Sequence, residues 1–340
     1  MTINNAIEVK GLTKKFGAFT AVDNISFEVK DREIFGFLGP NGAGKSTTIR
    51  MLCTLARPTG GDAIVNGYDL IKEPVKVRES IGLVAEKMIM YDQLTAAENL
   101  RFFGNLYNMP KQKIETRIDE LLKLVNMTEW KNTQIKKFST GMRQRINVVR
   151  ALLTEPKIIF MDEPTLGLDP QTTLSIRELI RDINKNGTTV ILTTHAMAEA
   201  EALSNRIAII DHGKIIALDT SHELKKLVKG NDLTMFNVKI SNMSPAIFEK
   251  LKSLDCVAAI VQPDAYDLKI STKGSDGLDR IVDTIRSNGG NIVTFNTTEP
   301  TLEDVFLTVT GKEMRDQANE KGTGTRQRHG PWGAPKSRVR

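Results

Sequence analysis

The sequence predicts an α/β protein in which a larger domain with a parallel sheet is followed by a small α+β domain. Residues 157–164, "KIIFMDEP", and 188–195, "TTVILTTH", are short, apolar and β-branched, as buried parallel strands are, and a helical pattern separates them. After residue 230 a second pattern of strands and helices begins. A chain of 340 residues has room for roughly two domains of about 150 residues, with a core in each.

Short strands with breaks at Gly and Asp begin the first domain, which predicts an antiparallel β subdomain there. Their ranges are 6–12, 19–29 and 33–38. From about Ile81 to Leu153 the pattern becomes mainly helical, because apolar side chains recur three and four positions apart. We therefore expect a helical insertion at about residues 83–153 of a first domain that spans residues 1–230.

The first domain closes with a hairpin that turns at Asp211 to Gly213 and a connecting helix that ends near Gly230. Residues 231–311 then follow the order strand, helix, strand, strand, helix, strand, which is typical of a ferredoxin-like unit. The final stretch, "PTLEDVFLTVTG", predicts a helix that packs against this second sheet. The second domain carries no group of residues with catalytic chemistry, which favours a regulatory or dimer-supporting role.

Charge and composition narrow the classes of function. The net charge is +6, but residues 312–340 hold eight Lys and Arg against three Asp and Glu, so the rest is close to neutral. We expect this basic tail to be disordered, either solvated or in contact with anionic lipid or nucleic acid. There is no signal segment and no long apolar run, so we expect neither export nor a membrane span. The two cysteines lack metal-type spacing, which fits a reducing, cytosolic setting.

The most specific chemical motif is a glycine-rich loop between a strand and a helix, the context that a phosphate-binding P-loop requires. Its glycines let backbone N–H groups surround phosphates, Lys45 reaches the terminal phosphates, and the Ser46 hydroxyl suits Mg²⁺. The predicted nucleotide-binding residues are Gly39, Pro40, Asn41, Gly42, Ala43, Gly44, Lys45, Ser46 and Thr47.

Two further strands end in residues that suit the same chemistry. One delivers Asp162 and Glu163 to the carboxyl edge of the sheet, where ligands bind in such folds. Asp162 is expected to hold Mg²⁺, directly or through water, and Glu163 to act as general base for the attacking water. His195 ends the next strand and is expected to contact the γ-phosphate. A terminal Asp-Glu pair or a lone histidine is often structural, and it is the P-loop that favours the catalytic interpretation.

A second anion site is predicted in "KKFSTGMRQRINVVRALL", residues 136–153. Ser139, Thr140 and Gly141 open a helix there with small side chains and free backbone N–H groups. One chain therefore carries two sets of phosphate-binding groups, although it has only one P-loop.

In this order the motifs resemble those of the nucleotide-binding subunits of ABC transporters, over about residues 7–225. The resemblance implies an ABC ATPase core, with the P-loop as Walker A and residues 158–163 as Walker B. The C-terminal part looks like that of the ABC-2, drug-exporter branch similar to daunorubicin-resistance ATPases. The remaining correspondences are Phe16 as the residue that stacks on adenine, Ser139, Thr140, Gly141 and Met142 as the signature, Asp169 as the end of the D-loop, and His195 as the switch histidine.

The resemblance also implies a reason for the two phosphate sites. In the family, two nucleotide-binding domains pair head to tail, and the signature helix of each caps the γ-phosphate of ATP bound to the other. Implied cofactors are ATP and Mg²⁺. Implied partners are a second copy, joined through the ATP sandwich, and a separately encoded membrane permease, in an exporter. The chain would lie in the cytoplasm, on the cytoplasmic face of the membrane, with no nucleic acid bound.

Two other functions remain compatible with a P-loop of this class. A soluble ABC ATPase acting on ribosomes or DNA is the main alternative, but such members usually carry two P-loops or long coiled coils, and this sequence has neither. A regulator without turnover is disfavoured by Asp162, Glu163 and His195. The transported substrate and the permease cannot be read from the chain, because the permease forms the path.

Two departures from the family pattern affect the site. Thr140 and Met142 replace the usual Gly and Gln of the signature, which keeps the phosphate donors but removes one polar side chain. Glu86 stands where the family usually has the Gln that contacts Mg²⁺ and links to the membrane partner. We expect Glu86 to join Asp162 and Glu163 around one Mg²⁺, since a hard cation prefers anionic oxygens. The alternative is that Glu86 points to solvent.

Overall fold

A computed structural model of the protein describes residues 5–229, 233–262, 264, 266–273, 277–298 and 300–310. The predicted basic tail, residues 312–340, lies outside the described residues, and so does Gly230. In the described part of the chain, no helix is both long enough and apolar enough to span a bilayer.

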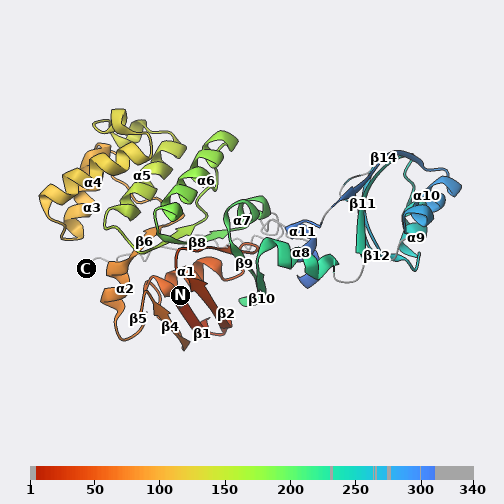
Figure 1. Cartoon of the computed structure of the whole chain (residues 1–340), viewed down its shortest axis with the longest axis horizontal. Coiled ribbons are helices and arrows are strands. Elements are labelled where there is room, and N and C mark those ends of the chain that lie inside the picture. Colours follow the sequence, from red (N-terminus) through yellow and green to blue (C-terminus); the bar gives the residue numbers. More distant parts are fainter. Residues whose placement is uncertain are drawn as a thin grey trace, which may run out of the picture.

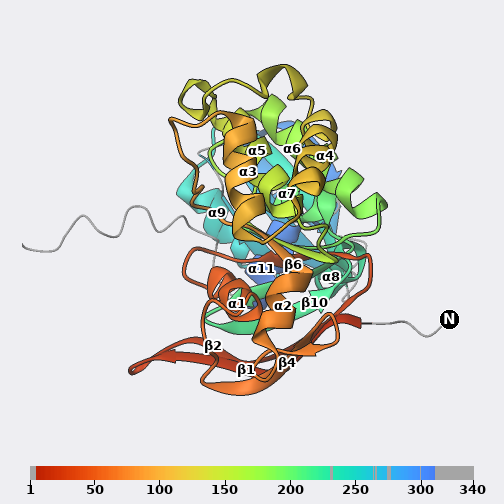
Figure 2. The same cartoon turned by 90° about the vertical axis from the view of Figure 1, so that its left-hand side faces the viewer.

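An antiparallel sheet of four strands, in the order β2-β1-β4-β5, confirms the predicted β subdomain for residues 6–12 and 19–29. Its members are β1 (Asn5–Phe16), β2 (Phe19–Lys30), β4 (Gly60–Val65) and β5 (Tyr68–Asp69). The third strand predicted there, residues 33–38, instead belongs to the central, mainly parallel sheet as β3 (Ile34–Leu38). β1 is longer than its predicted range of residues 6–12, and its pairing with β2 is irregular from Val9 onward. This sheet lies beneath the central one with α1 (Lys45–Leu52) between them (Figures 1 and 2).

The central sheet has six strands in the order β10-β9-β3-β8-β7-β6, and only the β9–β10 hairpin is antiparallel. Every residue of β3, β7 and β8 is buried, as expected for strands covered on both faces. The hairpin turns at His212 and Gly213, as predicted, and both have positive φ. The strands are β3 (Ile34–Leu38), β6 (Ile81–Val84), β7 (Ile158–Asp162), β8 (Thr189–Thr194), β9 (Arg206–Asp211) and β10 (Lys214–Asp219).

The predicted start of the helical insertion is wrong. Residues Ile81–Val84 form β6, which pairs in parallel with β7 at the sheet edge. Four apolar residues are too few to reveal a period of two or of 3.6, so the strand is hidden in the helical pattern that follows. The insertion itself consists of α3 (Ala96–Leu106), α4 (Lys111–Leu124), short 3₁₀ turns at Thr128–Trp130 and Ile135–Lys137, and α5 (Thr140–Leu152).

Three further helices of the first domain lie outside the insertion. They are α2 (Pro74–Ser80), α6 (Pro170–Lys185) and α7 (Met197–Leu203). One of them, α6, shares a hydrophobic core with the helices of the insertion. The insertion begins with a capping box, in which Thr95 and Glu98 each bond the backbone N–H of the other.

The second domain is a four-stranded antiparallel sheet in the order β12-β13-β11-β14, covered on one face by α9 and α10 (Figure 1). This order agrees with the predicted ferredoxin-like unit. Its core of nine buried apolar residues includes Phe236, Ile247 and Ile285. The elements are β11 (Leu233–Ser241), α9 (Pro245–Lys252), β12 (Val257–Val261), β13 (Asp267–Lys273), α10 (Gly277–Ser287) and β14 (Asn291–Thr298).

The last helix, α11 (Leu302–Thr310), corrects the expectation that it packs against the second sheet. Leu302, Val305 and Phe306 instead share a core mainly with α8 (Ser221–Lys229) and with α7, β3 and β9 of the first domain. Met235 of β11 is the member of this core that comes from the second sheet. A 4.0 Å ion pair between Lys269 and Glu303 links α11 to β13. The second sheet is therefore inserted between two helices, α8 and α11, that pack on the first domain (Figure 1).

Candidate active site

The P-loop joins β3 to α1, as predicted, and its backbone needs glycine at several positions. Gly42 and Gly44 have φ of 83° and 108°, the left-handed region that other residues rarely adopt. A Cβ on Gly39 would lie 2.1 Å from the Ile210 carbonyl oxygen. Lys45 opens α1 and is 4% exposed, and its ammonium donates to the carbonyl oxygens of Gly39, at 2.7 Å, and Pro40, at 3.2 Å.

Asp162 and Ser46 meet beside this loop although they are far apart in the sequence. The Ser46 hydroxyl donates to Asp162 Oδ1 at 2.8 Å, and the Thr193 hydroxyl donates to the same oxygen at 2.6 Å. Asp162 is buried at the end of β7 and Thr193 on the neighbouring strand β8. Thr193 thus fixes the orientation of the carboxylate, and sequence reasoning missed it because it lies inside an apolar strand.

Glu163 connects the P-loop lysine with the predicted switch histidine. Its Oε1 lies 3.3 Å from Lys45 Nζ, and its Oε2 lies 2.9 Å from His195 Nδ1. A carboxylate oxygen can only accept, so Nδ1 carries the proton of this bond. Oε1 accepts no hydrogen bond among the described residues, although it is buried. The Glu163 backbone has φ of 49°, unusual outside glycine, and its N–H donates to the Thr193 carbonyl at 3.2 Å.

These side chains border a pocket of about 470 Å³ at the carboxyl edge of the central sheet. It brings together predicted residues from five parts of the chain, and adds three that were not predicted, Phe19, Ala21 and Leu166. The predicted residues that line it are Phe16, Pro40, Asn41, Gly42, Gly44, Lys45, Ser46, Thr47, Glu86, Glu163 and His195.

The residues beside the P-loop fit a magnesium ion that is bound together with a nucleotide. Mg²⁺ usually takes one or two protein oxygens and completes its shell with phosphate and water, and Ser46 Oγ and Asp162 Oδ1 offer such a pair. The expected cluster of three carboxylates is not formed. In the part of the chain that the structure describes, no three Asp, Glu, His or Cys side chains are grouped to hold a metal. Glu86 borders the pocket without completing such a group.

The signature residues lie outside the nucleotide pocket of their own chain. Ser139 caps α5 by accepting from the Met142 N–H at 3.2 Å, and Ser139 and Thr140 are exposed. A Cβ on Gly141 would lie 2.5 Å from the Thr172 side chain, so glycine allows α5 to approach the first turn of α6. Met142 packs against the core of the insertion, where a polar glutamine would find less apolar contact.

Asp169 caps α6. Its carboxylate accepts from the Thr172 N–H at 2.9 Å and from the Thr172 hydroxyl at 2.6 Å, and these two bonds lower the pKa of Asp169. Thr172 therefore contacts both the D-loop and the signature helix.

Two buried polar side chains of α5, the helix that the signature residues open, connect it to two segments that border the nucleotide pocket. Gln144 donates to the Pro164 carbonyl at 2.7 Å, next to Glu163. Asn147 donates to the Ala85 carbonyl at 3.2 Å, next to Glu86, and to Gln144 Oε1 at 3.3 Å. Polar residues on the buried face of a helix are the sequence signal for such contacts, although their partners cannot be read from the sequence.

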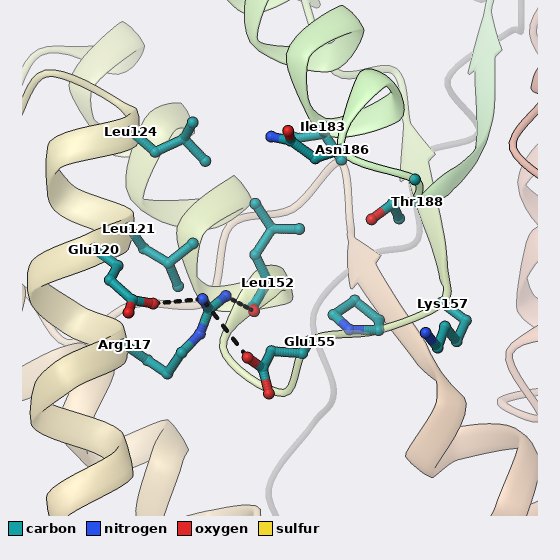
Figure 3. Close-up of a pocket in the computed structure, with 12 residues that line it drawn as sticks. Arg117, Glu120, Leu121, Leu124, Leu152, Glu155, Lys157, Ile183, Asn186 and Thr188 are labelled. Atoms are coloured by element: carbon teal, nitrogen blue, oxygen red, sulfur yellow. Dashed lines mark hydrogen bonds and ion pairs between the residues drawn. The ribbon is translucent and has the colours of Figure 1, made fainter.

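A smaller cavity of about 410 Å³ lies away from the nucleotide pocket, between α4, the end of α5 and the end of α6 (Figure 3). Arg117 of α4 crosses its wall, donating to Glu120 Oε2 at 2.7 Å and to the Leu152 carbonyl at 3.1 Å. It also lies 3.8 Å from Glu155. These contacts tie the insertion to the turn before β7, and the buried Nε of Arg117 has no hydrogen-bond partner among the described residues.

The P-loop, the buried Asp162 and the pocket define the class, a P-loop nucleotide-binding protein. Residues 22–166 match the profile of the ABC transporter family, and residues 220–310 match that of the C-terminal domain of DrrA1-3-like ATP-binding proteins. The chain is 37% identical over 314 residues to the linearmycin resistance ATP-binding protein LnrL of Bacillus subtilis, covering 91% of this chain and 100% of LnrL. It is 35% identical over 319 residues to the daunorubicin/doxorubicin resistance ATP-binding protein DrrA of Streptomyces peucetius, covering 93% and 96%.

Solved structures show the same core. The ATP-binding subunit of an ABC transporter superposes with a TM-score of 0.59 at 31% identity, covering 65% of this chain and 92% of that chain. A dimeric, post-hydrolysis ATP-binding cassette with bound ADP and phosphate gives a TM-score of 0.57 at 29% identity, covering 63% and 98%. The chain belongs to the ABC transporter family of ATP-binding proteins and is an ABC ATPase.

Proposed function

We propose that this chain hydrolyses ATP as a head-to-tail dimer and thereby drives export through a separate membrane permease. The observation that carries the dimer is the separation of two phosphate-binding elements: Lys45 and Glu163 border the pocket, whereas Ser139 and Gly141 of the same chain do not. Ser139 and Gly141 open a 13-residue helix, so their N–H groups and the helix dipole suit the γ-phosphate held by another copy. A related cassette of known structure is dimeric.

The site residues divide the reaction between them. Lys45 and the P-loop N–H groups bind the phosphates. Ser46 and Asp162 would hold Mg²⁺, which when bound would supply positive charge to neutralise the phosphates. The oxygen of the attacking water forms a bond to the γ-phosphorus, and the bond from that phosphorus to the β-phosphate oxygen breaks. Glu163 accepts the proton that the water loses, and His195 orients the Glu163 carboxylate. Lys45 leaves its contact with Glu163 as it engages the phosphates, which frees Oε1 for that proton.

The test of this proposal is Glu163→Gln. The amide is nearly isosteric but cannot accept the proton, so we expect hydrolysis to fall by roughly 10²- to 10⁴-fold while ATP still binds. Size-exclusion chromatography with Mg-ATP should then show a lasting dimer for the variant and a transient one for the wild type. A variant that remains monomeric and still hydrolyses ATP would overturn both the role of Glu163 and the sandwich.

The permease is proposed to dock on a groove of about 850 Å³ between α1, α2, β6 and the α3–α4 turn. Leu55, Leu106 and Tyr107 line it with largely exposed apolar side chains, which a soluble surface rarely gathers without a partner. Arg150 also lines it, but its guanidinium is already engaged, because it donates to the Ile89 carbonyl and to Asn147 Oδ1 and lies over the Phe103 ring. Export is proposed because the relatives are named for antibiotic resistance.

The docking proposal predicts that Leu106→Glu prevents co-purification with the proposed membrane permease, while ATP binding is kept. Leu174→Glu, on the exposed face of α6 and outside the groove, is the matched control. Equal recovery of the membrane protein with both variants would place the permease elsewhere on the surface.

A further inference from the structure

The β1–β2 hairpin presents two exposed phenylalanines at the mouth of the nucleotide pocket. Phe16 ends β1 and Phe19 begins β2, and the two are direct cross-strand partners around a turn at Gly17 and Ala18. Residues directly opposite in an antiparallel pair project from the same face. Both line the pocket, with 56% of Phe16 and 63% of Phe19 exposed.

The two rings are not engaged with each other. No ring contact between Phe16 and Phe19 is present among the described aromatic pairs, although direct cross-strand partners are close enough to make one. The ammonium of Lys14 lies 5.0 Å from the centroid of the Phe16 ring. Among the residues that the structure describes, Phe19 takes part in no ring or cation contact, so its ring is open to a ligand in the pocket.

We propose that Phe19 is a second base-contacting residue, so that the purine of ATP is held by two aromatic side chains from one hairpin. This inference rests on the proposed ATP site, in which the resemblance implies contact for Phe16 alone. A flat, apolar base gains most from aromatic surface that is otherwise wet, and an exposed ring has the most solvent to lose. Stacking depends on the face of the base more than on its substituents, so Phe19 adds affinity for purine nucleotides in general.

The experiment compares binding of ATP and of inorganic tripolyphosphate, both with Mg²⁺, by isothermal titration calorimetry. Tripolyphosphate engages the P-loop but has no base. Phe19→Ala should weaken ATP binding roughly 3- to 10-fold and leave tripolyphosphate binding unchanged within about 2-fold. Phe19→Trp should restore ATP binding. Phe102→Ala, which removes another exposed phenylalanine outside the pocket, is the matched control and should change neither.

The outcomes separate this inference from the proposed function. Wild-type ATP affinity in Phe19→Ala, with weakened affinity in Phe16→Ala, overturns the role of Phe19 and leaves the ATP site intact. An equal loss for ATP and tripolyphosphate also overturns it, because the change then acts on the P-loop. If Lys45→Ala binds both ligands as the wild type does, the ATP site itself is misplaced.

Discussion

Lys45 is held by polar groups of its own chain. Its ammonium donates to two P-loop carbonyls and lies 3.3 Å from Glu163, and both side chains are almost fully buried. Two opposite charges in a site of low polarity stabilise each other, and either one left alone would be costly. In the proposed reaction, the phosphates of ATP replace Glu163 as the anionic partner of Lys45, and Glu163 is then free to act as general base.

Glu86 borders the pocket, and its place in the metal shell stays a prediction. We expect Glu86→Gln to raise ATP affinity in EDTA by about 2- to 5-fold, because a negative charge near the phosphates is removed. We also expect it to raise the Mg²⁺ concentration needed for half-maximal ATPase rate, since a hard ligand is lost. Glu79→Gln, outside the pocket, is the control. Superimposable curves for Glu86→Gln and wild type would place Glu86 outside the metal shell.

Sequence reasoning was most successful for residues that belong to a motif. Lys45, Asp162 and Glu163 were predicted together because a P-loop and a buried strand fix their positions relative to the sheet edge. Phe19 and Thr193 were missed because their roles depend on strand register, which places Phe19 opposite Phe16 and Thr193 beside Asp162. The left-handed backbone of Glu163 also has no signal in the sequence, since non-glycine residues at positive φ are held there by their surroundings.

At the scale of elements, a bidentate ion pair joins α3 to α4. Arg101 donates from Nε to Glu115 Oε1 at 2.6 Å and from Nη2 to Oε2 at 2.9 Å. These hydrogen bonds, followed by the charge of Arg101, lower the pKa of Glu115 from its ordinary value of 4.5. Both side chains are nearly half exposed, so solvent screens the pair and its contribution is no more than about 1 kcal/mol.

The sign of the pH dependence follows from that lowered pKa. A carboxylate whose pKa is depressed in the folded state stabilises the fold above its unfolded value, and this stabilisation is lost as the pH falls through the folded value. We expect Arg101→Met to be less stable than wild type to urea at pH 6, and the difference to shrink towards zero as the pH falls from about 4.5 to 3. Circular dichroism of both proteins, with Glu115→Gln as the second arm of a mutant cycle, measures this. If the difference in unfolding free energy between the two proteins persists at pH 3, the destabilisation comes from lost packing of Arg101 and not from the ion pair.

The elements that the sequence misplaced share a physical cause. A helix with apolar residues on one side has the same pattern whichever surface it covers, so "PTLEDVFLTVTG" predicted a helix but not its neighbours. Strand β6 is too short for its period to be seen. The strand order of the second domain could be predicted, because the sequence strand, helix, strand, strand, helix, strand is typical of one known arrangement.

At the scale of the whole molecule, the position of α11 changes how the second domain can be removed. A cut near Gly230 looks harmless from the sequence, but it also removes α11. That helix packs in one core with Leu38, Ile207 and Ile209, which are fully buried in the first domain. Uncovering several such side chains costs several kcal/mol, at roughly 25 cal/mol for each Å² exposed.

We therefore expect a chain that ends at Lys229 to have a free energy of unfolding several kcal/mol below that of the full chain, or to aggregate. Removing residues 236–297 while keeping α11 should instead leave a stable first domain that binds ATP. Met235 and Thr298 are cross-strand partners, so their Cα atoms are about 5 Å apart and two glycines can join them. Urea denaturation and ATP titration of both variants test this. Equal stability of the two shortened chains would show that α11 contributes nothing to the first domain.

The two neighbouring strands that carry the second sheet also limit how it can move. A domain attached at one point can rotate in any direction. The second sheet is instead connected to the first domain through two neighbouring strands, β11 and β14, which give two points of attachment. We therefore expect the second sheet to move, relative to the first domain, mainly by rotation about the line through both points, while α8 and α11 stay packed on the first domain. A force on the second sheet therefore reaches α8 and α11 as a torque about that line, and its lever arm is the distance from the line measured along the strands.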